Sequence, residues 1–487
     1  MQVKTPELLS PAGSLSMLKT AFAFGATAVY AGQPRYSLRV RNNDFGDLET
    51  LQQGIDHAHA CGGKFFLVSN IYPHENKLKS YVANMNPVIA LKPDAMIMSD
   101  PGLIMMAREA WPDMEIHLSV QANTVNSAAV KFWKSVGISR VILSRELSLD
   151  QVAQIRQACP DTELEVFVHG ALCIAYSGRC LLSGYFNHRD ANQGSCTNSC
   201  RWDYKTVPGV VDASGDVLTQ AAAMGLPDLK SAPSAQGGGC GTGCGCATPD
   251  ATAESVVSMV QRDRAEVYLI EESQRPGSFM PIEEDEHGTY VMNSKDLRAI
   301  EHVQRLVEIG VDSLKIEGRT KSPYYVARTA QAYRRAIDDA VAGRSLNPEL
   351  LGQLEGLANR GYTSGFFQRH TPEATQNYLR GYSESGRSQY VADVLAYDAQ
   401  RGLVQVNVRN RFAVGDWLEV IHPKGNRDVQ IRHMENNDGQ PMQVAPGSGH
   451  VVWIDLPQGC EGAYVARYLQ APVDAGTLAA APAAATV

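Results

Sequence analysis

Four cysteines lie within 28 positions near the middle of the chain: Cys173, Cys180, Cys196 and Cys200. Four thiolates this close together predict a metal site, and soft sulfur ligands suit zinc and iron–sulfur clusters alike. Structural zinc sites usually pair cysteines with about two to four residues between them, and only Cys196 and Cys200 are paired so closely. The wider spacing of the others favours a cluster. A zinc site and four unlinked buried thiols are the alternative interpretations.

The other six cysteines carry a weaker signal. A second group lies in a Gly- and Ala-rich stretch that offers no apolar core to fix a site: Cys240, Cys244 and Cys246. We interpret it as incidental composition. Three cysteines lie alone and are expected to have structural roles, the first two at helix ends: Cys61, Cys159 and Cys460.

Polar residues with chemical potential follow several short apolar runs. Asn70 and Gln121 carry amides that can orient a carbonyl, an amide or a hydroxyl, and His169 can shuttle a proton. Arg145 and Arg319 follow two further runs. Helix caps, ion pairs and a buried core histidine are the alternative roles, but caps do not readily explain the arginines and Gln121.

Eight apolar runs alternate with helix-length amphipathic stretches between residues 8 and 319. Two of them, 65–68 and 96–98, lack inside/outside alternation, which is typical of parallel strands buried on both faces. The runs span 8–12, 28–32, 64–70, 95–100, 116–121, 141–146, 164–170 and 313–319.

Helix punctuation separates these runs. Ser148 and Gln151 form a capping-box pattern, and Gly25, Gly137 and Gly310 are placed to end helices just before strands. The alternation predicts a TIM-type (β/α)8 barrel, in which active sites gather at the carboxyl ends of the strands. That location would bring the polar residues named above together.

The predicted barrel domain spans residues 1–385 and is interrupted after its seventh strand by an insertion over 171–292 that bears the cysteines. Within the insertion, 230–252 is Gly-, Ala- and Ser-rich and is expected to be flexible. The runs 266–270 and 289–292 flank an acidic turn and are expected to pair as a hairpin over the barrel mouth. Short β-type runs over 386–470 predict a small antiparallel β-barrel-like domain, and 471–487 is expected to be a disordered tail.

Net charge, hydropathy and the absence of common motifs exclude several classes of protein. A net charge of -8 argues against sequence-blind attraction to nucleic acid, although a local basic patch remains compatible with it. No apolar run is long enough for a membrane helix, and the chain has no signal-peptide pattern, so a cytoplasmic location is expected. The usual motifs of metalloproteases, serine hydrolases, P-loop proteins and dinucleotide-binding proteins are missing.

Several motifs of the chain resemble those of the U32 peptidases, a family also called collagenase-like proteases. The segment from Glu165 to Cys173 and the segment from Gly178 to Ser183 match that family's signature. Further matching stretches are 6–13, 200–202, 292–297, 315–319 and 360–363. Within the family, the chain is most similar to the subgroup that hydroxylates tRNA, over roughly residues 5–470.

This resemblance implies oxygen-independent hydroxylation of the wobble uridine at C5, giving 5-hydroxyuridine, with prephenate as the hydroxyl donor. It also implies a 4Fe-4S cluster on Cys173, Cys180, Cys196 and Cys200, with Cys240, Cys244 or Cys246 as alternatives to the fourth ligand. The expected partners are the tRNA anticodon loop and the small co-substrate. The alternatives are a peptidase and a non-catalytic RNA-binding module with zinc.

Roles for individual residues follow from the implied substrates. Because prephenate carries two carboxylates, we expect fork-shaped donors in its pocket: Arg39, Arg41, Arg145 and Arg319. A splayed base would stack on aromatic side chains, and the candidates are Tyr176, Tyr185 and Trp202. Phosphate contacts are expected from Arg179, His188, Arg189 and Arg201, and, in the C-terminal domain, from Arg409, Arg411, Lys424, Arg427 and Arg432.

Overall fold

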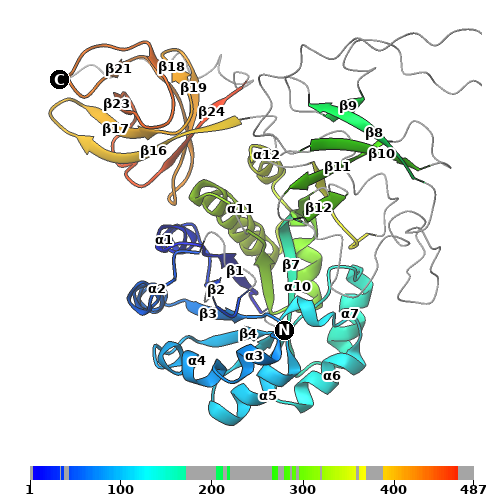
Figure 1. Ribbon diagram of the computed structural model, residues 1–487. Coiled ribbons are helices and arrows are strands. Elements are labelled where there is room, and N and C mark those ends of the chain that lie inside the picture. The colour runs from blue at the N-terminus through cyan, green and yellow to red at the C-terminus, as the bar shows by residue number, and fades with distance from the viewer. Residues whose placement is uncertain are drawn as a thin grey trace, which may run out of the picture. The chain divides into compact units, whose positions relative to one another are not determined.

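The structure of the protein is a computed structural model (Figure 1). It describes residues 4–32, 35–37, 43–171, 296–318, 321–357, 361–368 and 388–469, together with the backbone of five strands between residues 204 and 291. The chain divides into two compact units. One holds Met1–Gly178, Lys295–Thr375 and Glu384–Val487, and the other holds Arg179–Ser294 and Gln376–Ser383.

The first unit contains a closed barrel of eight parallel strands. Neighbouring strands pair in chain order from β1 to β7, and β14 pairs with both β7 and β1 to close the circle. The barrel and the antiparallel sheet that follows it confirm the predicted fold class. The strands are β1 (Glu7–Pro11), β2 (Ala28–Gly32), β3 (Lys64–Ser69), β4 (Ala95–Met98), β5 (Ile116–Leu118), β6 (Arg140–Ile142), β7 (Glu163–Ala171) and β14 (Ser313–Ile316).

Helices follow most barrel strands and are punctuated as the sequence predicted. Ser148 and Gln151 form both hydrogen bonds of the capping box, and Gly25, Gly137 and Gly310 have positive φ at helix ends, where glycine lacks the Cβ clash. The helices are α1 (Leu15–Ala23), α2 (Leu48–Ala60), α3 (Glu75–Leu78), α4 (Tyr81–Ile89), α5 (Pro101–Ala110), α6 (Ser127–Ser135), α7 (Leu149–Ala158), α10 (Val303–Ile309), α11 (Pro323–Val341) and α12 (Glu349–Glu355), with 3-10 turns η1 (Val120–Ala122) and η4 (Ile300–His302).

The main hydrophobic core lies between the barrel wall and these helices. On α11, the buried residues Val326, Ala330, Tyr333 and Ile337 recur every three or four positions, so they share one face of the helix. Burying a large apolar side chain of this kind contributes about 1.5–3 kcal/mol. Both predicted non-alternating runs are buried along their length, in β3 and β4.

Two short strands extend the barrel sheet beyond β7. β13 (Asp296–Arg298) runs antiparallel to the end of β7, and β15 (Tyr362–Thr363) runs parallel to β13. Runs of three and two residues are too short to show a strand period in the sequence. They were therefore not predicted.

The C-terminal part of the first unit forms an antiparallel sheet with its own core, which includes Val404, Val406, Val452 and Val465. Its strand order is β20-β19-β24-β16-β17-β23-β21. The strands are β16 (Ser388–Asp398), β17 (Leu403–Val408), β19 (Trp417–Ile421), β20 (Arg427–Gln430), β21 (Met434–Glu435), β23 (Val451–Ile454) and β24 (Tyr464–Tyr468), and β18 (Phe412–Ala413) pairs separately with β22 (Val444–Ala445).

The second unit contains an antiparallel sheet of order β12-β11-β10-β8-β9. The predicted hairpin between 266–270 and 289–292 is wrong, because β11 lies between these two segments and pairs with both. The acidic residues Glu283, Glu284 and Asp285 belong to β11 and not to a turn. The strands are β8 (Tyr204–Val211), β9 (Val217–Thr219), β10 (Glu266–Glu272), β11 (Phe279–Asp285) and β12 (Gly288–Val291).

In the part of the chain that the structure describes, no helix is both long and apolar enough to cross a membrane.

Candidate functional site at the barrel mouth

We define the mouth as the C-terminal ends of the eight barrel strands with the loops that follow them. Two of the predicted residues, Asn70 and Gln121, lie together there, at the ends of β3 and β5. The Asn70 amide nitrogen donates to Ser119 Oγ (3.5 Å), and Ser99 Oγ, at the end of β4, lies 3.1 Å from Gln121 Oε1. Ser99 Oγ is also 3.3 Å from the Asn70 carbonyl oxygen. One hydroxyl therefore links the two amide-bearing loops.

Arg145 lies at the mouth after β6 and contacts two other strands. Its Nη2 donates to Glu317 Oε2 (3.1 Å), beyond the end of β14, and its Nη1 donates to the Ala171 carbonyl oxygen (2.9 Å) at the end of β7. The guanidinium also lies 3.9 Å from the centroid of the Phe167 ring, a cation–π contact. Glu317 is buried. Arg145 therefore forms an ion pair, with Glu317, as the alternative interpretation of its role expected.

Close packing at Gly170 requires a glycine. Its φ is +105°, and a Cβ at this position would lie 2.4 Å from the Glu317 carbonyl oxygen. The Glu317 amide also donates to the His169 carbonyl oxygen (2.8 Å). The glycine therefore allows β7 and β14 to approach each other beneath Arg145.

His169 lies outside this polar group, in a pocket of three tyrosine rings. A bulge in β7 makes Val168 an extra residue opposite β14. Phe167 thus faces Lys315 and Arg145, whereas the His169 ring is surrounded by Tyr325, Tyr333 and Tyr362 at centroid distances of 5.5–5.8 Å.

The hydrogen bonds of Tyr333 set the His169 tautomer. The Tyr333 hydroxyl donates to the Val168 carbonyl oxygen (2.7 Å), so the 3.3 Å contact with His169 must use an Nδ1 proton. Nε2 is then an acceptor, and it is buried without a hydrogen-bond partner in the part of the chain that the structure describes. Burial, with smaller effects from Lys321 and Arg298, lowers the pKa of His169 to about 3. This placement favours the structural role for His169, and the proton-shuttle role stays a prediction.

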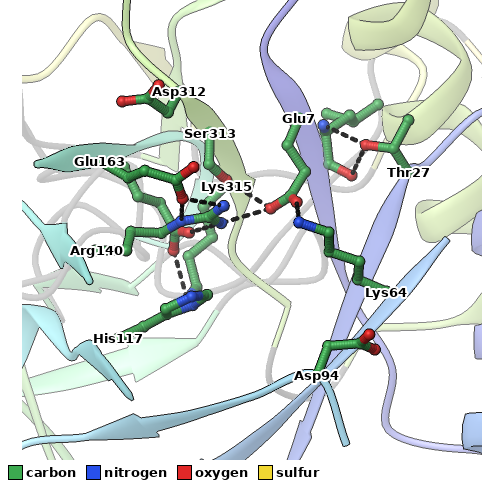
Figure 2. A network of polar contacts seen from close by, with 12 residues as sticks. Glu7, Thr27, Lys64, Asp94, His117, Arg140, Glu163, Asp312, Ser313 and Lys315 are labelled. Carbon is green, nitrogen blue, oxygen red and sulfur yellow. Dashed lines mark hydrogen bonds and ion pairs between the residues drawn. The ribbon is translucent and has the colours of Figure 1, made fainter. Parts of the chain in front are cut away.

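A network of buried charges occupies the opposite, N-terminal ends of the strands (Figure 2). Arg140 bonds Glu7 (2.5 Å), Glu163 (2.7 Å) and Glu165 (3.2 Å), and Glu165 also holds Lys315 (2.9 Å). Burial by itself would raise the pKa of Glu165, but the positive charges of Lys315 and Arg140 outweigh burial and lower it to about 2. The sequence did not predict this network, because most of its members come from strands that are far apart along the chain, although these strands are neighbours in the barrel.

The remaining predicted site residues lie outside the described residues. They are Arg39, Arg41, Arg319, Tyr176, Tyr185, Trp202, the phosphate-contact candidates Arg179, His188, Arg189 and Arg201, and the cysteines Cys173, Cys180, Cys196 and Cys200, with the alternatives Cys240, Cys244 and Cys246. The predicted flexible segment 230–252 and the predicted tail 471–487 lie outside the described residues as well. Within the described residues, no group of three or more His, Cys, Asp or Glu side chains is arranged to hold a metal ion. Of the three single cysteines, Cys159 and Cys460 are buried and Cys61 is exposed.

The C-terminal sheet carries exposed basic residues of two kinds. Arg409 is paired with Asp393 (2.6 Å). The others have exposed side chains with no ion pair to any described residue: Arg411, Lys424, Arg427 and Arg432. Lys424 and Arg427 lie at the turn and start of β20, respectively.

A parallel barrel with polar strand ends at one mouth is the architecture of a (β/α)8 enzyme scaffold. The family is settled by sequence: the model of peptidase family U32 matches residues 13–377, and the model of the U32 C-terminal domain matches residues 386–467. The chain belongs to the U32 family, as the motifs predicted.

Three similar proteins have names that refer to RNA hydroxylation or hydroxycytidine synthesis. A protein of Escherichia coli K12 named tRNA hydroxylation protein P is 54% identical over 94% of this chain and 95% of its own length. The Bacillus subtilis tRNA hydroxylation protein P1 is 31% identical over 91% of this chain and 90% of its own length. The E. coli 23S rRNA 5-hydroxycytidine C2501 synthase is 27% identical over 89% of this chain, which spans about half of that protein (52%).

Proposed function

We propose that this protein hydroxylates the wobble uridine of tRNA at C5, without molecular oxygen, using prephenate as the hydroxyl donor. The observation that carries the proposal is the match over 94% of the chain to a tRNA hydroxylation protein at 54% identity. The more distant relative named for 5-hydroxycytidine synthesis in rRNA supports the C5 position of a pyrimidine as the reaction centre.

Arg145 suits a carboxylate of the small co-substrate. A guanidinium has five N–H donors, and the bonds to Glu317 and Ala171 use two of them; of the other three, one is on the buried Nε and one is on each terminal nitrogen. The contacts with Glu317 and Phe167 fix the orientation of the fork before a ligand binds. In the proposed reaction Arg145 binds one carboxylate, and the amides of Asn70 and Gln121 orient a carbonyl or hydroxyl.

The four-cysteine set fits a 4Fe-4S cluster by the chemistry of its donors, since four thiolates are the usual ligands of such a cluster. Cys173, Cys180, Cys196 and Cys200 would hold it, and β7 ends at Ala171, two residues before the first of them. When bound, the cluster would either activate the oxygen donor or manage the electrons that leave the base, because hydroxylation at C5 oxidises uridine by two electrons.

The proposal is tested by mass analysis of wobble nucleosides from cells that lack this gene, in a strain without redundant hydroxylases. Complementation with the wild type is expected to restore 5-hydroxyuridine derivatives, and Cys180→Ala is expected not to. Cys61→Ala is the matched control, because Cys61 is an exposed single cysteine on a barrel helix end. Equal 5-hydroxyuridine levels in all strains would contradict the proposal.

A second experiment tests the donor and the cluster. Protein purified without oxygen is expected to contain iron and inorganic sulfide, both lost in Cys180→Ala, and to hydroxylate tRNA only when prephenate is added. Prephenate labelled with ¹⁸O in its hydroxyl group is expected to deliver the label to uridine. Unlabelled product would exclude prephenate as the hydroxyl source, and zinc in place of iron would exclude the cluster.

A further inference from the structure

Among the described residues, Tyr72 is an exposed aromatic side chain at the mouth. Tyr72 follows β3 by three residues and is 48% exposed. Its hydroxyl donates to the Gln121 carbonyl oxygen (3.0 Å), in the turn after β5. The backbone beside it is also held, because the Ile71 amide donates to the Tyr36 carbonyl oxygen (3.2 Å). The ring is therefore anchored at one edge while much of its surface faces solvent.

Hydrogen-bonding groups lie next to this ring. Gln121, whose carbonyl holds the Tyr72 hydroxyl, has one side-chain amide atom engaged by Ser99. Among the described residues, its other amide atom has no hydrogen-bond partner. The Asn70 amide lies on the same loop as Tyr72 and reaches the β5 end through Ser119. A flat ring beside side-chain amides is the combination that proteins use to hold an unstacked base of RNA.

Exposure of an aromatic ring does not by itself indicate such a site. Phe132 is more exposed, at 58%, but it lies on α6, and its ring contact is with Trp133. Among the described residues, no side-chain amide is hydrogen-bonded to Phe132, whose carbonyl oxygen accepts from Ser135. Tyr72 differs in its position at the mouth and in its bonded link to Gln121.

We infer that Tyr72 is the stacking surface for the pyrimidine base that enters the mouth, and that the Gln121 amide hydrogen-bonds the edge of that base. The inference rests on the proposed function and assigns the base position within it. Stacking on an aromatic side chain is worth about 1–3 kcal/mol per base, which corresponds to roughly 5- to 150-fold in affinity.

The test is a double-mutant cycle that combines a change in the protein with a change in the RNA. Binding is measured for two anticodon stem-loop RNAs, one with uridine and one with an abasic nucleotide at the wobble position. The wild type is expected to bind the uridine RNA about 5- to 150-fold more tightly. Tyr72→Ala is expected to lose most of this preference, Tyr72→Phe to keep most of it because the ring remains, and Phe132→Ala to keep all of it.

The outcomes separate the inference from the proposed function. If the wild type prefers uridine and Tyr72→Ala keeps the same preference, the stacking role is wrong while the hydroxylase proposal stands. If the wild type hydroxylates tRNA but binds both RNAs equally, stacking at the mouth is likewise excluded. If the wild type neither binds nor hydroxylates these RNAs, the proposed function fails and the inference fails with it. Unchanged thermal unfolding of each variant excludes a folding defect.

Discussion

Glu165 has an ionised carboxylate in the barrel interior, with no solvent exposure. Its charge is stable there because Lys315 and Arg140 lie within 2.9 and 3.2 Å. Removing one member of a buried pair leaves its partners without compensation, which is more costly than removing the whole pair. Replacing Glu165 is therefore expected to lower the free energy of unfolding mainly because Lys315 and Arg140 lose a compensating negative charge.

We predict that Glu165→Gln lowers the free energy of unfolding by about 3–5 kcal/mol, measured by urea unfolding. The matched control is Arg305→Ala, which removes a half-exposed helix pair with Glu308 and should cost less than about 1 kcal/mol. Because the pKa of folded Glu165 is about 2, below its ordinary value of 4.5, this stabilisation is present above pH 4.5 and is lost as the pH falls toward 2. Similar losses in both variants would contradict the prediction.

His169 gives a pH dependence in a higher range. Its pKa is about 3 in the folded protein, against 6.5 ordinarily, so below pH 6.5 the unfolded chain binds a proton that the folded protein does not. The contribution of neutral His169 to the free energy of unfolding is complete above pH 6.5. It decreases by up to about 1.4 kcal/mol per pH unit as the pH falls toward 3. We expect His169→Asn to show a correspondingly shallower dependence between pH 6 and pH 4 in urea unfolding. Parallel curves for both proteins would contradict this.

At the scale of elements, α11 joins the barrel to the C-terminal sheet. Arg328, on this helix, bonds Glu419 of β19 with both terminal nitrogens, one of them at 2.7 Å from Oε1. Tyr324 of α11 stacks on Tyr390 of β16 at 4.6 Å, and Gln331 donates to the His422 carbonyl oxygen (2.9 Å). One helix thus packs on the barrel wall and on the sheet.

We predict that Arg328→Ala lowers the free energy of unfolding by about 3–5 kcal/mol, because it leaves the Glu419 carboxylate buried without a cation. The double variant Arg328→Met/Glu419→Leu should recover most of this loss, since it removes both charges. Arg344→Ala, which breaks the ion pair between an exposed arginine and the partly exposed Asp339, is the control. Both effects are measured by urea unfolding, and a double variant as unstable as the single one would show that packing and not charge dominates.

Sequence patterns predicted the barrel strands and the helix ends correctly, because each leaves a signal within a few neighbouring residues. The strands appear as short continuous apolar runs, since they are buried on both faces, and glycines with positive φ mark the helix ends. β11 was missed because its acidic residues resemble a turn. The pairings Arg145–Glu317 and Glu165–Lys315 join residues 172 and 150 positions apart, and no local pattern encodes such register. The proposed stacking residue, Tyr72, was not singled out either, although an aromatic residue just after a strand end is visible in the sequence.

At the scale of the whole molecule, a net charge of -8 must be reconciled with the proposed RNA substrate. Local basic groups can provide phosphate contacts despite an acidic total. The turn and strand that carry Lys424 and Arg427 offer two exposed cations without ion pairs to described residues. Arg409 is already neutralised by Asp393.

We predict that Lys424→Ala/Arg427→Ala weakens tRNA binding and reduces the slope of log affinity against log salt by about two. Arg409→Ala is the matched control and should change the slope little, because its charge is paired in the free protein. The measurement is a salt titration of tRNA affinity. An unchanged slope in the double variant would exclude this part of the sheet from phosphate contact.

The buried network around Arg140 limits the side of the barrel from which small molecules can enter and leave. Paired side chains fill the N-terminal ends of the strands, where Arg140, Glu165 and Lys315 are almost fully buried. Within the described residues, these pairs close the N-terminal side of the barrel. In the proposed reaction, the small co-substrate and the RNA therefore both reach the reaction centre from the mouth, so each affects the access of the other.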